Sequence, residues 1–517
     1  MKKCLLTAGA LLLWSGTVFA GGTGDTVTLP SDTYNAILQK LDALQKRVDM
    51  LEEKPAAPVA AAPGVSREEY DKLAGDVNNI YDTLDVVETK ALQDRINWGA
   101  ELRTRVDNYK LSDLSGVDAV ILKNPDGSLR MVAPNGDNEY DDNNWTNRIR
   151  LNMDAKINQT LSFHGRMTVF KNWGDSDITS TALFNDMNRA HRPGTSGVKL
   201  DRAYIDWVPD FILPVAVTIG RHPSTEGPPV EYKENRQRQS TYPSLLFDAE
   251  NDGIVVTLGL ERYTGLKNSG WRFAYGKGYH SDDDDSSSFS FFDDGNEAGD
   301  TDMYATFLES EIPGLKNSLV VLSYAHLTDL PSSFLGAESP VSLGDMDLYG
   351  VHLQASNLVE SNFDVFVSWA ANKTDANGER AIFRDVADTP WGTIDIPAGL
   401  LTDDGQDDRS GHSIFAGLRY NIPYAPFHNP KIGFEYNHGS KYWMSMTMAS
   451  TEMFNKLATR GDAYELYYIQ PVNENLFFRL GYTKIEYDYT GSGSHLGQPQ
   501  ETDAELSNYY LLMDCRF

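Results

Sequence analysis

Cysteine is almost absent from this 517-residue chain, which holds Cys4 and Cys515 and no others. Basic charge is also scarce, because 45 Lys and Arg face 74 Asp and Glu, a net charge of -29. That balance argues against a nucleic-acid binder, which needs a basic face. Long apolar runs are confined to the first 20 residues, so a bundle of membrane-spanning helices is excluded. Aromatic residues are plentiful, which excludes a disordered acidic chain.

The N-terminus has the pattern of an export signal. Lys2 and Lys3 precede an apolar stretch, and Val18-Phe19-Ala20 supplies small residues at cleavage spacing. We therefore expect residues 1–20 to be a signal peptide removed after Ala20. The alternative, a retained anchor helix, is disfavoured because the apolar run is short for a bilayer. Cleavage leaves Cys515 alone, so no internal disulfide is expected.

Residues 21–96 predict a helical appendage with two heptad seams. A Pro/Ala linker at 54–65 separates them, because such a sequence cannot continue a helix. We expect a self-associating coiled coil in the periplasm, since short helices need a partner. A hairpin folded across the linker is the alternative. The seams are Tyr34, Ile37, Leu41, Leu44, Val48 and Leu51, then Tyr70, Leu73, Val77, Ile80, Leu84, Val87 and Ala91.

From Asn97 onward the apolar period changes to two. In 97–109, for example, Leu102 and Thr104 share one face while Arg103 and Arg105 share the other. Segments 145–157 and 161–172 alternate in the same way. Runs of this length exceed ordinary strands and suit tilted strands that cross a bilayer.

Short and long connections also alternate along the chain, as in an outer-membrane barrel with short periplasmic turns and long external loops. The fold class is therefore an all-β transmembrane barrel over 97–517, with about 16 antiparallel strands; fourteen or eighteen are alternatives. The expected strands are 97–109, 145–157, 161–172, 198–208, 214–222, 252–260, 270–279, 301–312, 317–327, 346–357, 362–371, 411–421, 430–440, 460–470, 475–489 and 506–517.

The chain ends in Phe517, preceded by apolar residues at every second position. This ending resembles the membrane assembly signal of bacterial outer-membrane proteins. Together with NWGAELRTRVDNY, LSFHGRMTVFKNWGDS, LDRAYIDW and HGSKYW, the chain resembles a family of proteobacterial porins with an N-terminal coiled coil. The resemblance implies a homotrimer in outer-membrane lipid that lets small hydrophilic solutes and ions diffuse through a water-filled pore. A substrate-specific channel, a sheath around a partner protein and a structural tether are the alternatives.

The alternation predicts a wall of arginines on the polar face of the first four strands. In porins the loop after the fifth strand folds inward, and here that loop is acidic. An arginine wall facing acidic loop groups would give the pore its ion selectivity. The alternative is that the arginines pair with Glu101, Asp107 and Asp154 to solvate a polar interior. The expected pore-lining residues are Arg103, Arg105, Arg148, Arg150, Arg166, Arg202, Glu226, Glu231 and Glu234.

Two acidic clusters lie in the expected external loops. Asp282, Asp283, Asp284 and Asp285 form one, and a second runs from Asp403 to Asp408. Carboxylates favour Ca²⁺ or Mg²⁺, but neither spacing is that of an EF-hand, so a solvated charge run is the preferred interpretation. No haem, zinc-protease, nucleophile-elbow or phosphate-loop motif is present, so we expect no enzyme and no cofactor beyond such an ion.

Overall fold

The structure, a computed structural model, divides the chain into two units, Met1–Arg95 and Ile96–Phe517. It describes residues 96–113, 120–123, 129–132, 139–175, 196–279, 299–332, 341–389, 392–447 and 452–517. The predicted signal peptide, coiled coil and linker lie outside the described residues, apart from isolated positions 72, 75, 76 and 79. Within the described ranges, no helix is both long enough and apolar enough to cross a membrane.

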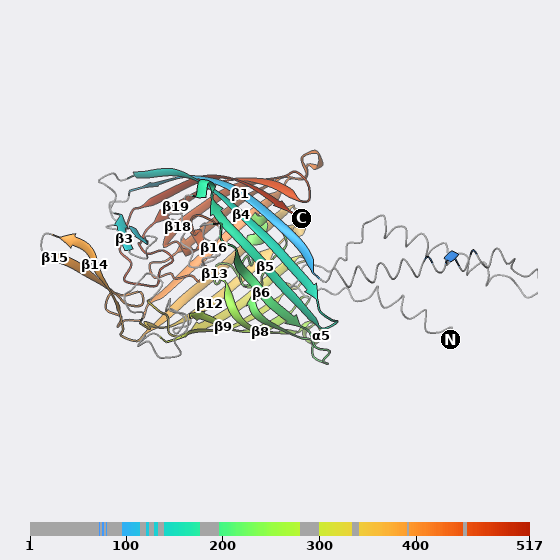
Figure 1. Cartoon of the computed structure of the whole chain (residues 1–517), viewed down its shortest axis with the longest axis horizontal. Coiled ribbons are helices and arrows are strands. Elements are labelled where there is room, and N and C mark those ends of the chain that lie inside the picture. The colour runs from blue at the N-terminus through green and yellow to red at the C-terminus, as the bar shows by residue number, and fades with distance from the viewer. Residues whose placement is uncertain are drawn as a thin grey trace, which may run out of the picture. The chain divides into compact units, whose positions relative to one another are not determined.

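The described residues of the second unit form a closed barrel of sixteen antiparallel strands, as the alternation predicted (Figure 1). Each strand pairs with its neighbours in the chain. The strands are β1 (Asn97–Ser112), β4 (Glu139–Lys156), β5 (Leu161–Asn172), β6 (Lys199–Trp207), β7 (Val215–His222), β8 (Asn251–Gly259), β9 (Gly270–Tyr279), β10 (Thr301–Ser310), β11 (Ser318–Leu327), β12 (Gly344–Ala355), β13 (Phe363–Ala376), β16 (Ser410–Asn421), β17 (Lys431–Gly439), β18 (Gly461–Pro471), β19 (Leu476–Tyr487) and β20 (Glu505–Arg516).

Several strands extend beyond their predicted ends. β4 begins at Glu139 rather than 145, and β13 continues to Ala376 rather than 371. The added residues are mostly polar, so they carry no apolar alternation that a sequence pattern could detect. Backbone pairing across the ladder holds them in the sheet.

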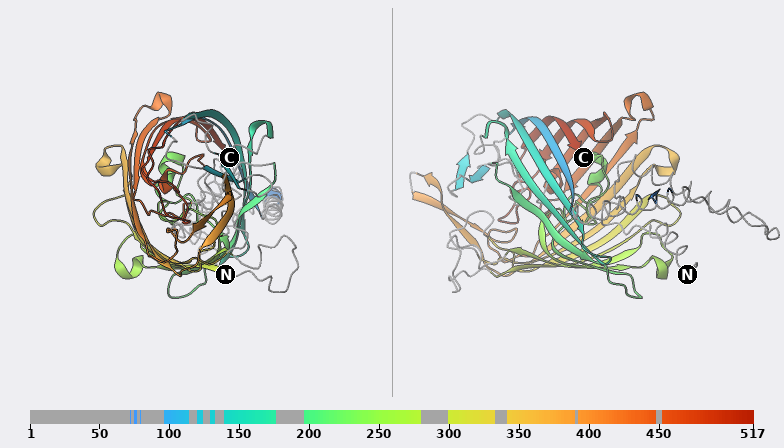
Figure 2. Two further views of the ribbon diagram at one scale, coloured as in Figure 1. Left: turned by 90° about the vertical axis from the view of Figure 1, so that its left-hand side faces the viewer. Right: turned by 45° about the vertical axis from the view of Figure 1, so that its right-hand side comes forward.

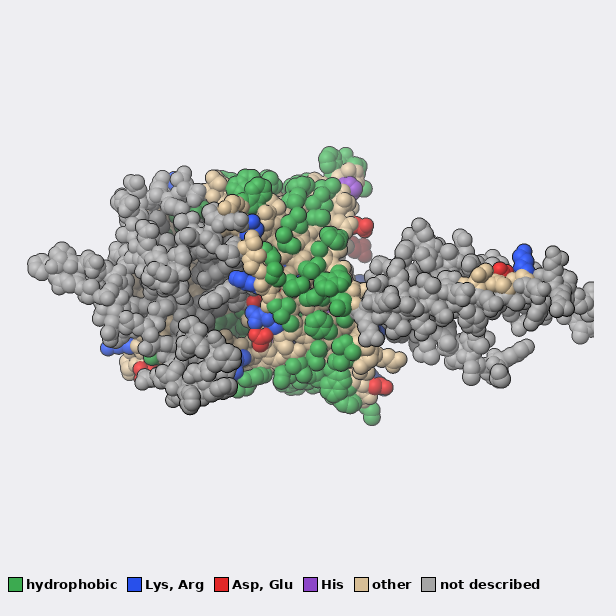
Figure 3. Space-filling model, in the orientation of Figure 1, with side chains coloured by type: hydrophobic (Ala, Val, Ile, Leu, Met, Phe, Trp, Pro, Cys, Tyr) green, Lys and Arg blue, Asp and Glu red, His purple; other side chains and the backbone are tan. Residues whose placement is uncertain are grey.

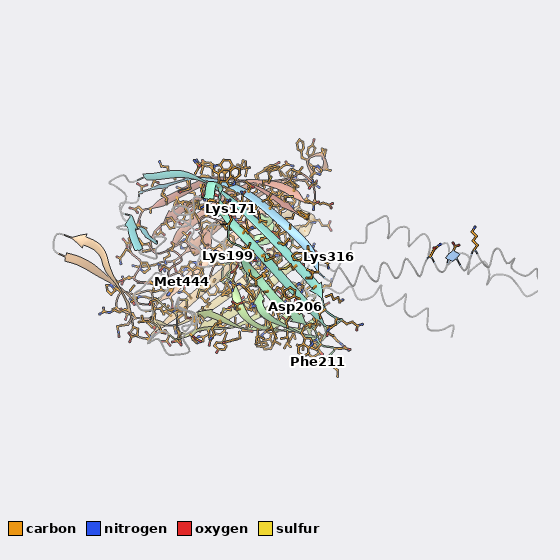
Figure 4. All side chains as sticks on the ribbon, in the orientation of Figure 1. Lys171, Lys199, Asp206, Phe211, Lys316 and Met444 are labelled. Atoms are coloured by element: carbon orange, nitrogen blue, oxygen red, sulfur yellow. The ribbon has the colours of Figure 1, made fainter. Side chains whose placement is uncertain are left out.

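Short connections gather at one end of the barrel and long ones at the other. Figure 4 labels Phe211 and Lys316 in two short turns, and Lys171 and Lys199 toward the opposite end. The long connections hold two small hairpins, β2 (Val120–Lys123) with β3 (Leu129–Val132), and β14 (Ala381–Thr389) with β15 (Gly392–Ala398). Helical segments are short: η2 (Trp173–Asp175), α4 (Val230–Glu234), α5 (Glu261–Thr264), η6 (Leu358–Glu360), η7 (Ala425–Phe427) and η8 (Lys456–Ala458).

The barrel closes where the first and last strands meet. β1 pairs with β20 from Glu101 opposite Arg516 to Ser112 opposite Glu505. Beyond that ladder, the backbone N–H of Phe517 donates to Ala100 at 3.0 Å, and the Phe517 carbonyl accepts from Ala100 at 2.8 Å. Phe517 therefore ends the seam with its backbone paired and its side chain exposed.

Alternate residues of each strand point outward, and most of these are apolar. On β1, Trp98 is 56% exposed while Arg103, on the other face, is 4% exposed. In Figure 3 the outward apolar side chains form a broad green band across the visible strands. A side-chain period of two determines which face each residue occupies, so the arginines expected inside are inside.

Two connections fold into the barrel interior. One, called here the inner loop, comprises residues 223–250 between β7 and β8 and contains α4. The other, the second inner loop, comprises 440–460 between β17 and β18, described at 440–447 and 452–460. The two meet at a bridge between Phe247 and Met446. Viewed along the barrel in Figure 2, chain segments lie inside the ring of strands.

One half of the inner wall is apolar, which the sequence analysis did not anticipate. Inward residues of β8 to β13 and of β16 pack against apolar residues of both inner loops in a single buried cluster. On β10, for example, Met303 and Phe307 point inward while Tyr304 and Leu308 point outward. Both faces of such a strand are apolar, so the pattern alone does not identify the inner one. The charged half is the wall of β18 to β20, β1 and β4 to β6.

Candidate functional site

Six arginines, called here the arginine wall, lie on the inner face of four strands that are consecutive around the barrel. They are Arg103 and Arg105 on β1, Arg148 and Arg150 on β4, Arg166 on β5 and Arg202 on β6. Arg103 is directly opposite Arg148, and Arg166 is opposite Arg202. Like charges in opposite positions repel. The wall therefore depends on carboxylates of the same strands and of the inner loops.

Glu226 of the inner loop supplies the central countercharge. Its carboxylate lies 2.6 Å from Arg150, 3.6 Å from Arg166, 3.8 Å from both Arg148 and Arg202, and 4.0 Å from Arg236 of the same loop. Burial alone would raise the pKa of this carboxyl, but the surrounding guanidinium groups hold that pKa well below its usual range. The loop is thus bound to the wall as an ionised carboxylate.

Glu234, in α4, anchors the loop at a second place on the same side. Its carboxylate pairs with Arg103 and, at 3.2 Å, with Arg479 of β19. Burial opposes ionisation, yet the arginines hold the pKa of Glu234 well below its ordinary value. Glu452 of the second inner loop pairs with Arg105 and, at 3.1 Å, with Arg479. The sequence analysis missed Glu452 and Arg479, because nothing in a polar loop marks which carboxylate will turn inward.

Glu231 does not join the arginine wall. It accepts a hydrogen bond from Gln354 of β12 at 2.8 Å, on the apolar half of the barrel. The hydroxyl of the neighbouring Tyr232 is hydrogen-bonded to the hydroxyl of Ser356 at 2.9 Å. The backbone carbonyl of Tyr232 accepts a hydrogen bond from Arg419 of β16 at 2.5 Å. Burial raises the pKa of the Glu231 carboxyl. The inner loop thus contacts both walls and crosses the interior.

The alternative pairing considered for the wall also occurs in part. Arg105 pairs with Asp107 at 2.7 Å, and Glu101 lies 3.8 Å from both Arg148 and Arg150. Asp154 instead lies 2.6 Å from His164 of β5. The arginines are therefore neutralised by carboxylates of the strands and of the loops together.

A small cavity of about 60 Å³ lies between the two inner loops and the charged wall. Lys233 of the inner loop lies 3.0 Å from Glu465 of β18, and Lys456 of the second inner loop pairs with the same carboxylate and with Glu435 of β17. Charged groups of both signs line the cavity with Phe415 and Phe454. A hydrated solute that passed this point would meet carboxylates and cations together.

The ionised loop carboxylates predict an acid-sensitive interior. A lowered folded-state pKa gives stability that is present above the ordinary carboxyl value of 4.5 and is lost as the pH falls through the folded value. Unfolding can be followed on an SDS gel as the temperature at which the band of folded protein is replaced by the band of unfolded protein. We expect this temperature to be constant from about pH 8 to about pH 5 and to fall steadily at lower pH. The double variant Glu226→Gln/Glu234→Gln should lose a measurable part of this acid dependence, and the other buried carboxylates with lowered pKa values should keep the rest.

Glu231→Gln is the matched control for that experiment. The pKa of Glu231 is shifted upward, so this residue does not contribute the stability that acid removes. The control should retain the wild-type fall below about pH 4.5. An acid fall of equal size in the double variant would contradict the assignment.

Comparison with known proteins places the chain in a family. Residues 138–514 match the family described as "Protein of unknown function (DUF3373)". The chain belongs to this family. It matches no curated protein.

Several solved structures are similar to this DUF3373 chain at low sequence identity. OprB of Pseudomonas putida is 13% identical, with a TM-score of 0.45 over 83% of this chain and 96% of that one. OmpF of Salmonella typhi, in a complex with daunomycin, is 9% identical, with a TM-score of 0.41 over 82% and 97%. OmpT of Vibrio cholerae is 10% identical, with a TM-score of 0.37 over 82% and 97%. The sequence identities and TM-scores are low, so the geometry of this chain is the basis for its proposed function.

The described acidic cluster of the DUF3373 chain, from Asp403 to Asp408, gives no support for a metal centre. Asp282 to Asp285 lie outside the described residues. Asp408 accepts from the backbone of Ala376 at 3.0 Å, and Asp407 pairs with Arg409 at 2.9 Å. In the described ranges, no group of three or more acidic, His or Cys side chains is placed to hold a metal ion.

Proposed function

We propose that this protein is an outer-membrane channel for small hydrophilic solutes and ions, narrowed by its inner loop. The observation that carries the proposal is a closed barrel with an apolar exterior and, along half of its interior, a charged wall. Closure leaves no strand edge unpaired, which is what a sheet within a bilayer requires. A charged interior surface has no role in an apolar solvent unless water or solutes reach it.

Two rows of outward aromatic side chains support a position across a membrane. Near the short turns the exposed residues include Trp98, Trp207, Trp271 and Phe363. Toward the loop end, tyrosines of adjacent strands pair around the barrel. Their ring centroids are 5.5 Å apart for Tyr275 and Tyr304, 5.3 Å for Tyr324 and Tyr349, 5.2 Å for Tyr436 and Tyr464, and 4.5 Å for Tyr482 and Tyr509. Aromatic rows of this kind lie at the two interfaces of outer-membrane barrels.

Outward charged side chains lie beyond the paired tyrosines, closer to the loop end of the barrel. Lys277 contacts Asp302 at 2.7 Å, and Arg221 contacts Asp252 at 2.6 Å. His438 lies 3.0 Å from Asp462. Such groups suit the polar headgroup layer and are costly within hydrocarbon. The apolar band between the aromatic rows is the part that we assign to the membrane core.

The interior favours a selective channel over a wide one. The inner loops fill the apolar half and leave a small cavity beside the charged wall. We therefore place the conduction path along the charged half. We do not propose a sheath around a partner protein, since the chain's own loops occupy the interior. The coiled coil, the trimer and the periplasmic position of residues 21–96 stay predictions.

Single-channel recording of the purified full-length protein in planar bilayers tests the proposal. We expect discrete conductance steps from folded protein, identified by its anomalous migration on SDS gels before boiling. Boiled protein is the control and should give none. Folded protein that inserts into the bilayer and carries no ion current would overturn the channel proposal.

A further inference from the structure

The arginine wall holds more hydrogen-bond donors than its neighbours use. Among the described residues, five guanidinium groups lie within 4.0 Å of the single carboxylate of Glu226. Two other carboxylates share them, because Glu101 pairs with Arg236 and Asp201 pairs with Arg166 at 2.8 Å. Each guanidinium carries five N–H donors, whereas a carboxylate offers about four acceptor positions. The cluster is therefore short of acceptors.

Arg148 shows the shortage most directly. Its side chain is 2% exposed, and none of its three nitrogens has a hydrogen-bond partner in the described part of the chain. Its contacts with Glu101 and Glu226 are both 3.8 Å long, beyond hydrogen-bond range. A buried donor without an acceptor is costly, and a charged one more so. Arg148 is thus a cation directed toward a position that Glu226 fills incompletely.

Glu226 fits its position among the arginines poorly. Its backbone has φ of +61°, in the left-handed region that non-glycine residues seldom adopt. Its second carboxylate oxygen, Oε2, accepts no hydrogen bond within the described residues, although three arginines lie within 4.0 Å. The loop end is held in this conformation by the bond from the Glu226 backbone N–H to Asp248 at 2.9 Å. The Glu226 carboxylate, fixed to the loop backbone, therefore accepts hydrogen bonds from only part of the surrounding arginine cluster.

We propose that Arg148, Arg150, Arg166, Arg202 and Arg236 form a binding site for a solute oxyanion, and that Glu226 is a built-in competitor which this oxyanion displaces. The ligand class is a small anion with at least two negative charges and three or more oxygens, such as phosphate or sulfate. Arginine suits this task because its planar fork bonds two oxygens of one oxyanion. The inference rests on the proposed channel function and names the solute class for it.

Displacement of Glu226 would couple oxyanion binding to a change in the conformation of the inner loop. Glu226 is the inner loop's charged contact nearest to β7, whereas Glu234 holds α4 separately through Arg103 and Arg479. A competing oxyanion would therefore release the first residues of the loop and leave α4 in place. An intramolecular competitor weakens the apparent affinity of a ligand by the fraction of time that it occupies the site. Removing that competitor should strengthen binding.

Calorimetric titration of the folded full-length protein with inorganic phosphate tests the site without relying on ion flow. We expect Glu226→Gln to bind phosphate at least about tenfold more tightly than wild type. Arg148→Gln, made in the Glu226→Gln background, should lose that gain. Because the Arg148 side chain makes no hydrogen bond within the described residues, its replacement should leave folding intact, as the SDS-gel assay would verify.

Glu231→Gln is the matched control for charge, since it removes one carboxylate from the same loop at the other wall. It should bind phosphate as wild type does. Equal affinity in wild type and Glu226→Gln, absence of binding in both, or undiminished binding after the loss of Arg148 would each overturn the site. Bilayer recording separates the two proposals. Phosphate binding without conductance would contradict the channel proposal. Conductance without phosphate binding would contradict the oxyanion site.

Discussion

Replacing residues 227–247 by two glycines should raise the single-channel conductance several-fold. This excision removes α4 and the loop residues that contact both walls, so the bore should widen toward that of an open barrel. The chain can be rejoined because the Glu226 backbone N–H already lies 2.9 Å from the Asp248 side chain. The barrel should still insert, since its backbone hydrogen bonds lie within the ladder of strands. Single-channel recording at fixed salt measures the change.

The β14–β15 hairpin offers a control excision of comparable size. It forms a separate two-stranded sheet outside the barrel ladder and projects at the loop end in Figure 1. Removing residues 382–397 should leave the conductance close to that of wild type. If the two excisions changed conductance equally, the inner loop would not be what narrows the bore.

Trp443→Ala should cost about 3–5 kcal/mol in the free energy of unfolding, the usual loss for a buried tryptophan. Trp443 is 0% exposed in the second inner loop, and its indole N–H donates to the carbonyl of Leu457 at 2.8 Å. The change leaves both a cavity and an unpaired carbonyl. Denaturant unfolding of the protein in detergent micelles would measure the loss.

Trp369→Ala is the comparison for that measurement. Trp369 is 41% exposed on the outer face of β13, where detergent can fill the space left by the ring. Its loss should cost clearly less than that of Trp443. Equal costs would mean that the second inner loop adds no packing to the interior.

The strands were predictable because they repeat one simple rule. β5 begins and ends at the expected residues, 161 and 172, and its arginine faces inward as the period of two requires. The connection lengths also predicted that short turns gather at one barrel end and long connections at the other. The same rule placed the arginine wall, since a one-residue error would have moved every arginine to the outer face.

The loop contacts could not be predicted in the same way. Glu226, Glu231 and Glu234 lie in one acidic segment with no period, and the sequence alone does not separate them. The structure does, because Tyr232 packs between Phe366, at 6.2 Å between rings, and Arg419, at 4.9 Å from its ring. That packing carries Glu231 to the apolar half. It depends on strands more than a hundred residues away, which a local pattern cannot report.

The seam between β1 and β20 has a consequence for biogenesis. The first strand of the barrel pairs with β4 on one edge, but its other edge is covered only by the last strand, where Arg103 pairs with Asp514 at 2.7 Å and Ala100 bonds Phe517. Until that strand is in place, both edges of the sheet present unpaired backbone groups, which invite pairing with other chains. A chain shortened by one strand at its C-terminus would keep two open edges, and Arg103 would lose Asp514, one of the two carboxylates that it pairs with.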